Sequence, residues 1–265
     1  WTNCEPGDSE DARLTRELAD QHRIRVLVLD NYHFSTAYQD LVRADAWSLV
    51  CVDDYGHCRE WHADVLLNQN PPARRPAAEQ LLRGPQTMLL WGERYALLRR
   101  EFRLAALMPQ SQTENGHLLI TFGGVDPVGA TQRVLDSLER GNFPQWQIRV
   151  IVGPGNVFLS ELQAQVAASR YRIELFVAVT NMVEQYRWAD RVISAAGSSC
   201  YEWMSLRKCA WVGVIAANQR EVASHLHIQG LATVWLCEDW ECAAELDASL
   251  LSLIHISEPT RPRLI

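Results

Sequence analysis

The chain has 265 residues, of which 48% are hydrophobic and 22% charged, and its formal net charge is −7 at pH 7. This length suffices for one large domain or two medium ones, and the composition excludes a wholly disordered chain. No apolar run is long enough to cross a membrane, and the negative charge argues against a nucleic-acid-binding surface. We therefore expect a cytoplasmic protein with no membrane or nucleic-acid partner.

The first part of the chain alternates predicted helices and strands. Apolar residues with helical spacing precede a nearly continuous apolar run that ends in Asp30, which is typical of a buried parallel strand. Ser35 is expected to cap the next helix, and Pro71, Pro72 and Pro76 predict a loop that enters a short helix. The other elements expected here are a helix at 8–21, strands at 23–30, 48–53, 65–68 and 87–91, and helices at 36–44 and 97–107.

The polar stretch at 108–116 has turn-forming residues and no apolar period, so it predicts a linker. A second α/β alternation follows, and strands that alternate with helices imply parallel βαβ units. The elements expected here are strands at 117–122, 147–152, 172–177, 191–195, 209–215 and 231–236, and helices at 127–140, 157–169, 181–188, 199–207, 219–229 and 239–250.

The predicted fold class is α/β, with two Rossmann-like domains. We expect the first domain at 1–105, a linker at 106–116 and the second domain at 117–251. The run from Ser252 to the end resembles the translated read-through of a sequencing adapter, so we expect 252–265 to be a non-native tail that packs poorly.

The seven cysteines are odd in number and irregularly spaced, and no C-x-x-C occurs. We expect reduced thiols rather than disulfides or metal ligands. His57, Cys58 and His62 are the densest group of other potential ligands, and we expect the loop that carries them to be merely solvated, with no metal.

Ligands of parallel sheets lie at the carboxyl ends of the strands, so residues directly after predicted strands are of interest. Gly123 and Gly124 follow the strand at 117–122, and Asp126 and Pro127 stand where a helix should begin. Glycines allow close approach of a ligand, and free N–H groups of a helix suit a phosphate or diphosphate. A tight turn with no ligand is an equally good interpretation.

Gly197 follows the strand at 191–195, and Ser198 or Ser199 is placed to cap the next helix. Glu202 stands three residues after Ser199, which is the spacing of a capping box. The alternative is that Glu202 accepts hydrogen bonds from a ribose diol, as acidic residues do in nucleotide-binding folds.

Two more groups follow predicted strands. Asn218 and Gln219 precede a helix, where Asn218 is expected either to cap that helix or to donate to a phosphate or sugar oxygen. In the first part of the chain, Tyr32 and His33 are candidates for acid–base chemistry. Asp30 and Asp53 are the expected orienting residues, and ordinary turn chemistry is the alternative.

Taken in order, these segments resemble the PseG/SpsG family of UDP-sugar hydrolases of bacterial nonulosonate biosynthesis, which are relatives of the MurG-type GT-B glycosyltransferases. The resemblance covers about residues 24–235; each motif is weak, and the ordered set is specific. The matching segments are Leu27–Tyr32, Val52–Asp54, Asp64–Asn70, Arg94–Phe102, Phe122–Pro127, Asn181–Met182, Ala195–Glu202 and Ala217–Gln219.

The resemblance implies a GT-B fold that holds UDP mainly in its second domain. It implies hydrolysis of UDP-2,4-diacetamido-2,4,6-trideoxy-β-L-altropyranose to UDP and free sugar, in pseudaminic acid biosynthesis, with no cofactor. Tyr32 is the implied catalytic residue. The implied substrate-binding residues are Gly123, Gly124 and Asn218 with Gln219 for the diphosphate, Ser198, Ser199 and Glu202 for the ribose, and Phe176 and Val177 for the uracil.

The sequence departs from this family at its beginning. The family opens with a Gly-x-Gly-His loop after its first strand, and no such loop occurs here. We therefore expect an incomplete first domain, weak UDP binding and little turnover. A MurG-type glycosyltransferase and a nucleotide-sugar-binding protein without catalysis remain the alternatives.

Overall fold

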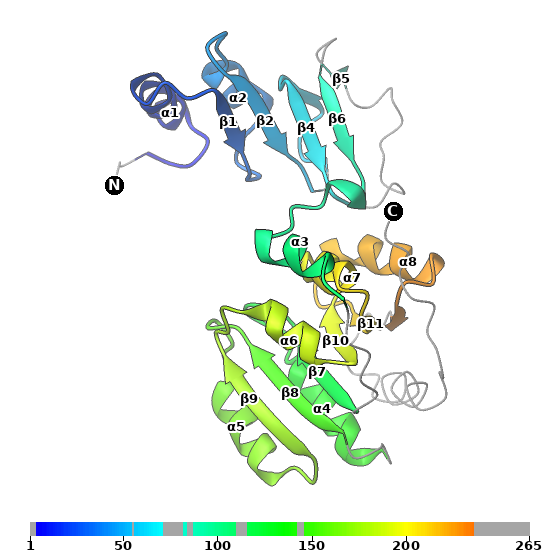
Figure 1. Ribbon diagram of the computed structural model, residues 1–265. Helices are drawn as coiled ribbons and strands as arrows, with labels where there is room; N and C mark the ends of the chain where they lie inside the picture. Colours follow the sequence, from blue (N-terminus) through cyan, green and yellow to red (C-terminus); the bar gives the residue numbers. More distant parts are fainter. Residues whose placement is uncertain are drawn as a thin grey trace. The chain divides into compact units, whose positions relative to one another are not determined.

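The computed structural model describes residues 4–54, 56–70, 82–83, 87–109, 116–141 and 146–235 (Figure 1). The chain divides into two compact units, Trp1–Leu97 and Leu98–Ile265, which we call the first and second units. The predicted proline loop, most of the predicted linker, the helix at 239–250 and the tail at 252–265 lie outside the described residues, as do Cys237 and Cys242.

The division between the units falls earlier than the expected boundary at residue 105. Helix α3 (Arg100–Ala106) packs against helices α6 and α7 of the second unit, because Phe102 and Ala105 are buried there. The predicted helix at 97–107 therefore exists in shortened form, and it belongs to the second unit.

The first unit contains a four-stranded sheet in the order β1-β2-β4-β6, with all strands parallel. Two short strands, β3 and β5, form a separate parallel pair that the sequence did not predict. The elements are α1 (Ser9–Gln21), β1 (Val26–Leu29), α2 (Thr36–Val42), β2 (Ser48–Val52), β3 (Glu60–Trp61), β4 (Val65–Asn68), β5 (Leu82–Arg83), β6 (Met88–Trp91) and the 3-10 turn η2 (Glu93–Tyr95).

Side-chain caps begin both helices of the first unit. Asp8 accepts from the backbone N–H of Asp11 at 2.7 Å, and Ser35 accepts from that of Tyr38 at 3.3 Å, as its sequence position predicted. The core beneath them includes Leu29, Leu49 and Leu66. Strand β1 is less buried than the rest of this core, because its residues Val26 and Val28 are largely exposed.

The second unit contains a six-stranded parallel sheet in the order β12-β11-β10-β7-β8-β9. The elements are β7 (His117–Thr121), α4 (Ala130–Arg140), β8 (Gln147–Val152), α5 (Leu159–Ala168), β9 (Arg172–Val177), α6 (Met182–Trp188), β10 (Arg191–Ala195), α7 (Ser199–Ser205), β11 (Cys209–Gly213), the 3-10 turn η3 (Ala217–Gln219), α8 (Arg220–Ile228) and β12 (Thr233–Trp235).

The strand order fixes where this sheet reverses its direction of winding. From β7 the chain proceeds outward through β8 to β9, then returns to β10 on the other side of β7 and proceeds outward through β11 to β12. Strands β7 and β10 are therefore neighbours from which the two halves of the sheet diverge. In open α/β sheets, this switch point is the usual place of a ligand, at the carboxyl ends of the strands.

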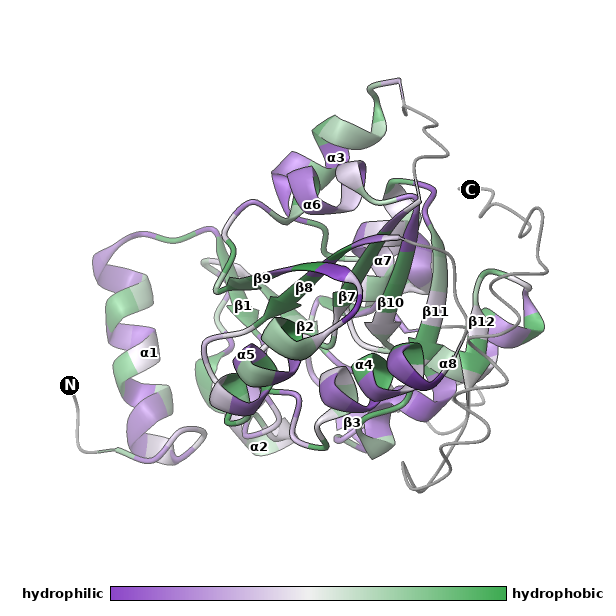
Figure 2. Cartoon of the chain, turned by 90° about the horizontal axis from the view of Figure 1, so that it is seen from below, coloured by the Kyte–Doolittle hydropathy of each residue, from purple (hydrophilic) through white to green (hydrophobic). Residues whose placement is uncertain are grey.

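Both faces of the central strands are buried, which explains why these strands read as apolar runs. One face packs on α4 and α5 through a core that includes Val134, Leu138 and Leu162. Helices α3, α6 and α7 pack together, and they bury Phe102, Tyr186 and Trp203. Figure 2 shows the resulting contrast between the apolar strands β7, β8 and β10 and the mixed surfaces of helices such as α8.

Lys208, the only lysine of the chain, is buried in the second unit. Its ammonium group donates to the carbonyl oxygen of Ala189 at 2.7 Å and to that of Arg187 at 3.3 Å. These carbonyls lie at the C-terminal end of helix α6, where backbone acceptors have no partner within the helix and a cation is favoured. Lys208 therefore stabilises this end of α6. Burial lowers the pKa of this amine.

Three further observations concern the described segments alone. None of their helices has both the length and the apolar character needed to span a bilayer. No disulfide joins the five cysteines that they contain. They also contain no group of three or more side chains arranged to hold a metal ion.

Candidate functional site

The turn after β7 is the most open part of the switch point. Gly123 and Gly124 are exposed, and a β-carbon added at either position would meet no atom of the described residues within 4 Å. Gly123 also has a φ of 85°, which favours glycine. The sequence prediction of a glycine turn directly after this strand is thus confirmed, and open space lies beside it.

The neighbouring loop after β8 supports this turn. Gly153 and Gly155 donate their backbone N–H groups to the carbonyl oxygens of Gly123 and Gly124, each at 3.2 Å. A β-carbon at Gly153 would lie 2.2 Å from the carbonyl oxygen of Gly124, so the two backbones approach as closely as only glycine allows. The turn is therefore held from one side by backbone contacts and is open on the other.

The start of helix α4 differs from the prediction. The helix begins at Ala130 rather than at Pro127, with Gly129 as its cap at a φ of 63°. The buried carboxylate of Asp126 accepts from the N–H groups of Ala130 and Thr131 at 2.8 and 2.9 Å, and from the Thr131 hydroxyl at 2.7 Å. Asp126 thus occupies donors that we expected a phosphate to use, which leaves the glycine turn as the open feature.

The loop after β10 brings two hydroxyl groups to the neighbouring strand end. Ser198 is exposed and caps helix α7, but its side chain makes no capping hydrogen bond. The Ser199 hydroxyl lies 3.4 Å from that of Ser194. Because Ser198 rather than Ser199 is the cap, the predicted capping box between Ser199 and Glu202 is wrong.

Glu202 instead pairs with an arginine that is distant in sequence. Its Oε1 atom accepts from Nε and Nη2 of Arg99 at 3.2 and 3.0 Å, and its side chain is 18% exposed. Burial raises the pKa of this carboxyl group, and the Arg99 guanidinium acts in the opposite direction. The side chain is therefore an acceptor held at the surface of α7, and it takes no part in starting the helix.

The loop after β11 lies beside the loop after β10. Gln219 accepts from the backbone N–H of Ile215 at 2.9 Å through Oε1, and its Nε2 lies 3.7 Å from where a β-carbon of Gly197 would stand. Asn218 is exposed within η3. Gln219, not Asn218, is the cap position of α8, so the predicted Asn cap is wrong.

Phe176 and Val177 stand apart from this group. They end β9, an edge strand that β7 and β8 separate from β10. The guanidinium of Arg149 lies 5.5 Å from the Phe176 ring centroid, and it also donates to Glu174 and Gln185. The ring is therefore partly engaged in packing, whereas Val177 is exposed.

A separate cluster of polar side chains lies at the carboxyl ends of the first unit's strands. The Tyr32 hydroxyl donates to the Asp54 carboxylate at 3.0 Å, and Tyr32 is 48% exposed. Asp54, which the sequence analysis did not single out, is thus a partner of Tyr32. His33 lies in the same turn, where its backbone N–H donates to the Asn31 side chain at 3.3 Å.

His57, which we expected in a solvated loop, belongs to this cluster of polar side chains. His57 is only 10% exposed, its Nδ1 lies 3.4 Å from the buried carboxylate of Asp53, and its ring packs edge-on against Trp61 and Tyr32. The expectation of a merely solvated loop is therefore wrong. The signal that the sequence offers is the Asp53–His57 spacing directly after a buried strand.

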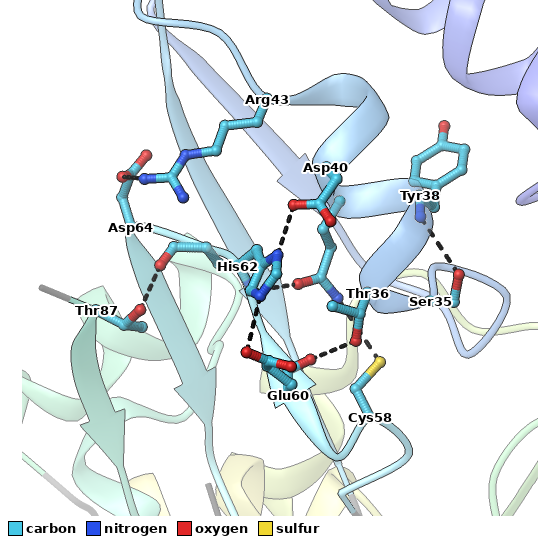
Figure 3. Close-up of polar contacts among 12 residues, drawn as sticks. Ser35, Thr36, Tyr38, Asp40, Arg43, Cys58, Glu60, His62, Asp64 and Thr87 are labelled. Atoms are coloured by element: carbon cyan, nitrogen blue, oxygen red, sulfur yellow. Dashed lines mark hydrogen bonds and ion pairs between the residues drawn. The ribbon is translucent and has the colours of Figure 1, made fainter. Parts of the chain in front are cut away.

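His62 is the centre of another set of polar contacts in the first unit (Figure 3). Its Nδ1 lies 2.5 Å from Asp40, its Nε2 lies 3.1 Å from Glu60, and its backbone N–H donates to Gln39 at 2.8 Å. Hydrogen bonding to Asp40, and then to Glu60, raises the pKa of His62. This imidazole ties α2 to β3, which indicates a structural role.

No family model matches the chain. The uncharacterized protein MJ1062 of Methanocaldococcus jannaschii is 24% identical over 188 residues, which make up 68% of this chain and 38% of that protein. The chain thus spans well under half of the length of this relative.

Several solved structures resemble the chain at low sequence identity. MurG of Acinetobacter baumannii has a TM-score of 0.58 at 14% identity, over 92% of this chain and 69% of its own. MnaA of S. aureus, determined with UDP, has a TM-score of 0.60 at 11% identity, over 98% and 76%. The spinosyn rhamnosyltransferase SpnG with thymidine diphosphate has a TM-score of 0.58 at 13% identity, over 93% and 69%. The fold of this chain is accordingly α/β of the GT-B type, with two Rossmann-like domains.

Proposed function

We propose that the second unit binds a nucleoside diphosphate and that the chain acts on a nucleotide-linked sugar. The observation that carries this proposal is the open Gly123–Gly124 turn at the switch point of a parallel sheet. Similar folds in structures determined with UDP or thymidine diphosphate support the same class of ligand.

Each candidate residue is assigned to one part of such a ligand. Backbone at Gly123 and Gly124 approaches the diphosphate, with Asn218 and Gln219 beside it. Ser198 and Ser199 supply hydroxyl groups, and Glu202 accepts from the ribose diol. Phe176 and Val177 are assigned to the base only through the family resemblance, since β9 lies at the sheet edge.

Glycosyl transfer is the reaction that we favour. The likeness in fold to MurG and to a rhamnosyltransferase supports it. In this reaction the bond from the sugar C1 to the diphosphate oxygen breaks, an acceptor oxygen bonds to C1, and the acceptor proton passes to a base. Tyr32 with its Asp54 partner is the candidate acid–base group in the first unit.

Hydrolysis is the second candidate, and the ordered set of motifs shared with the PseG/SpsG hydrolases favours it. Water then replaces the acceptor, and the products are UDP and the free diacetamido-trideoxy sugar. The two reactions use the same donor and differ only in what attacks C1.

Calorimetric titration of UDP into wild type and Gly124→Ala tests the binding proposal. The added methyl group meets no atom of the part of the chain that the structure describes, so the variant should fold normally, and its methyl should obstruct the ligand. We expect affinity to fall by about tenfold or more, equivalent to about 1.4 kcal/mol. Val125→Ala is the control, since it shortens an exposed side chain of the same loop. Equal UDP affinity in all three proteins would refute the site.

Release of UDP from UDP-sugars, measured with and without added acceptors, tests the reaction. Transfer predicts release that depends on an acceptor, whereas hydrolysis predicts release in water alone from the diacetamido-trideoxy donor. Tyr32→Phe should lower either rate by about 10²–10⁴-fold if Tyr32 is the acid–base group. Binding without turnover under both conditions would indicate that the chain binds a nucleotide sugar and does not catalyse its reaction.

A further inference from the structure

The ion pair between Arg99 and Glu202 has a geometry that bears on ligand binding. Two donors of Arg99, Nε and Nη2, are directed to the same oxygen of Glu202, Oε1, at 3.2 and 3.0 Å. Within the described segments, no other side chain donates to this carboxylate. The second oxygen, Oε2, is thereby left to accept from another molecule.

We infer that Arg99 is a positioning residue for a ribonucleotide: it fixes Glu202 through Oε1 and presents Oε2 to the ribose diol. This inference rests on the proposed function, because it assumes that Glu202 meets a ribose. Arg99 lies 103 positions from Glu202 in sequence, just before α3, and it touches the ligand only through Glu202 in this scheme.

Neighbouring groups hold both members of the pair in place. The Arg99 guanidinium lies 5.0 Å from the centroid of the buried Phe102 ring, and its Nη1 lies 3.3 Å from Glu101. On the other side, the Ser205 hydroxyl donates to the backbone carbonyl of Glu202 at 2.7 Å. Side chains fixed in advance lose less conformational entropy when a ligand binds.

The groups around Glu202 have opposing effects on the pKa of its carboxyl group. Burial and the nearby Glu101 raise the pKa of the Glu202 carboxyl group, and Arg99 opposes both. The Tyr186 hydroxyl, on α6, is buried close to this pair and stays neutral because burial raises its pKa. Arg99 thus favours the ionised form of Glu202, and an ionised carboxylate accepts hydrogen bonds more strongly than a protonated one.

The test is the pH dependence of UDP affinity for the full chain, measured by calorimetry between about pH 5.5 and 8.5. In Arg99→Met the pKa of Glu202 should rise, so affinity should fall at low pH and recover at high pH. If only the ionised carboxylate binds, a rise of one pKa unit lowers affinity by up to about tenfold, and the full factor is reached only below the wild-type pKa. Arg99→Lys retains the charge and should keep the midpoint near that of wild type.

A double-mutant cycle with Glu202→Gln separates the inference from a simple packing role. If Arg99 acts through Glu202, Arg99→Met should change neither affinity nor pH profile once Glu202 is Gln. The profile of Glu202→Gln alone also reports the titration of the ligand phosphates. Arg103→Met is the matched control, because it removes an exposed arginine from α3, the helix that directly follows Arg99. Melting temperatures are recorded for every variant.

The same cycle distinguishes failure of the inference from failure of the proposed function. If Glu202→Gln binds UDP as tightly as wild type, the ribose assignment is wrong. If Glu202→Gln weakens binding but Arg99→Met leaves both affinity and midpoint unchanged, only the inference is overturned. An equal loss in Arg99→Met at every pH, retained in the double variant, also overturns it, because Arg99 then acts independently of Glu202.

Discussion

The two units place polar residues at the same point of their sheets, the carboxyl ends of parallel strands, but they use them differently. In the first unit these groups bond to one another, as in Tyr32 with Asp54 and Gly56 with Asp53. In the second unit the Gly123–Gly124 turn stays open, and the exposed Ser198 side chain caps nothing. A strand end becomes a candidate binding site where its polar groups are not consumed by the turn itself.

The sheets also differ in how completely they are buried. The second unit centres on β10, whose Ile193 is fully buried between β7 and β11. The first unit has β1 at the end of its sheet, and Val28 there is 56% exposed. Similar apolar sequences thus occupy very different environments, so substitutions in them should differ in cost.

The largest expected effect is in the core of the second sheet. Ile193→Ala should lower the free energy of unfolding by about 2–5 kcal/mol, because it leaves a cavity in the central strand. Val28→Ala, a truncation in β1 that removes one carbon fewer, should cost less than about 0.5 kcal/mol. Urea denaturation followed by circular dichroism measures both. Equal costs would mean that Val28 is buried in solution, and the contrast between the sheets would fail.

Carboxylates that accept from N–H groups at the start of a helix give a second comparison of intermediate size. Asp126→Ala removes a buried carboxylate that accepts three hydrogen bonds, and it should cost about 1–3 kcal/mol. Asp8→Ala removes the exposed cap of α1 and should cost about 0.5–1 kcal/mol. The same denaturation measurement ranks the two carboxylates. A larger loss for Asp8→Ala would show that burial of the carboxylate does not set the cost.

The smallest expected effect is the pH dependence that His62 gives to the first unit. Its pKa is raised in the folded state by Asp40 and Glu60, so its stabilisation is complete below about pH 6.5. That stabilisation is lost as pH rises through the higher folded pKa. Because both carboxylates are about half exposed, the change should be only about 0.2–1 kcal/mol.

His62→Gln is the control for this prediction, since glutamine keeps hydrogen-bonding capacity but does not titrate near neutral pH. Its stability should vary less between about pH 6 and 8.5 than that of wild type. Identical curves for the two proteins would exclude His62 as the titrating group.

Local patterns predicted most of the fold. Apolar runs identified β7 and β10, and Ser35 marked the start of α2 because its capping bond spans only three residues. Contacts between distant residues were not predictable in this way. The spacing of Ser199 and Glu202 suggested a local capping box, whereas the carboxylate pairs with Arg99 across 103 positions.

The same reason explains other differences from the prediction. Strands β3 and β5 contain two residues each, which is too short for a periodic signal. The start of α4 shifted because Asp126 reaches forward to Ala130 and Thr131. In the candidate site, sequence indicated the glycine turn correctly, but only the fold reveals that Asp126 has taken the nearby helix donors.

The burial of Lys208 has a practical consequence for labelling this protein. Amine-reactive reagents acylate accessible amines, and the single lysine side chain is 7% exposed and enclosed by backbone carbonyls. In the folded chain Lys208 should therefore react much more slowly with such reagents than an exposed lysine would. Its modification requires local or global opening of the second unit, so the rate of modification reports on the stability of that unit. A nucleotide that binds the folded unit should slow this reaction.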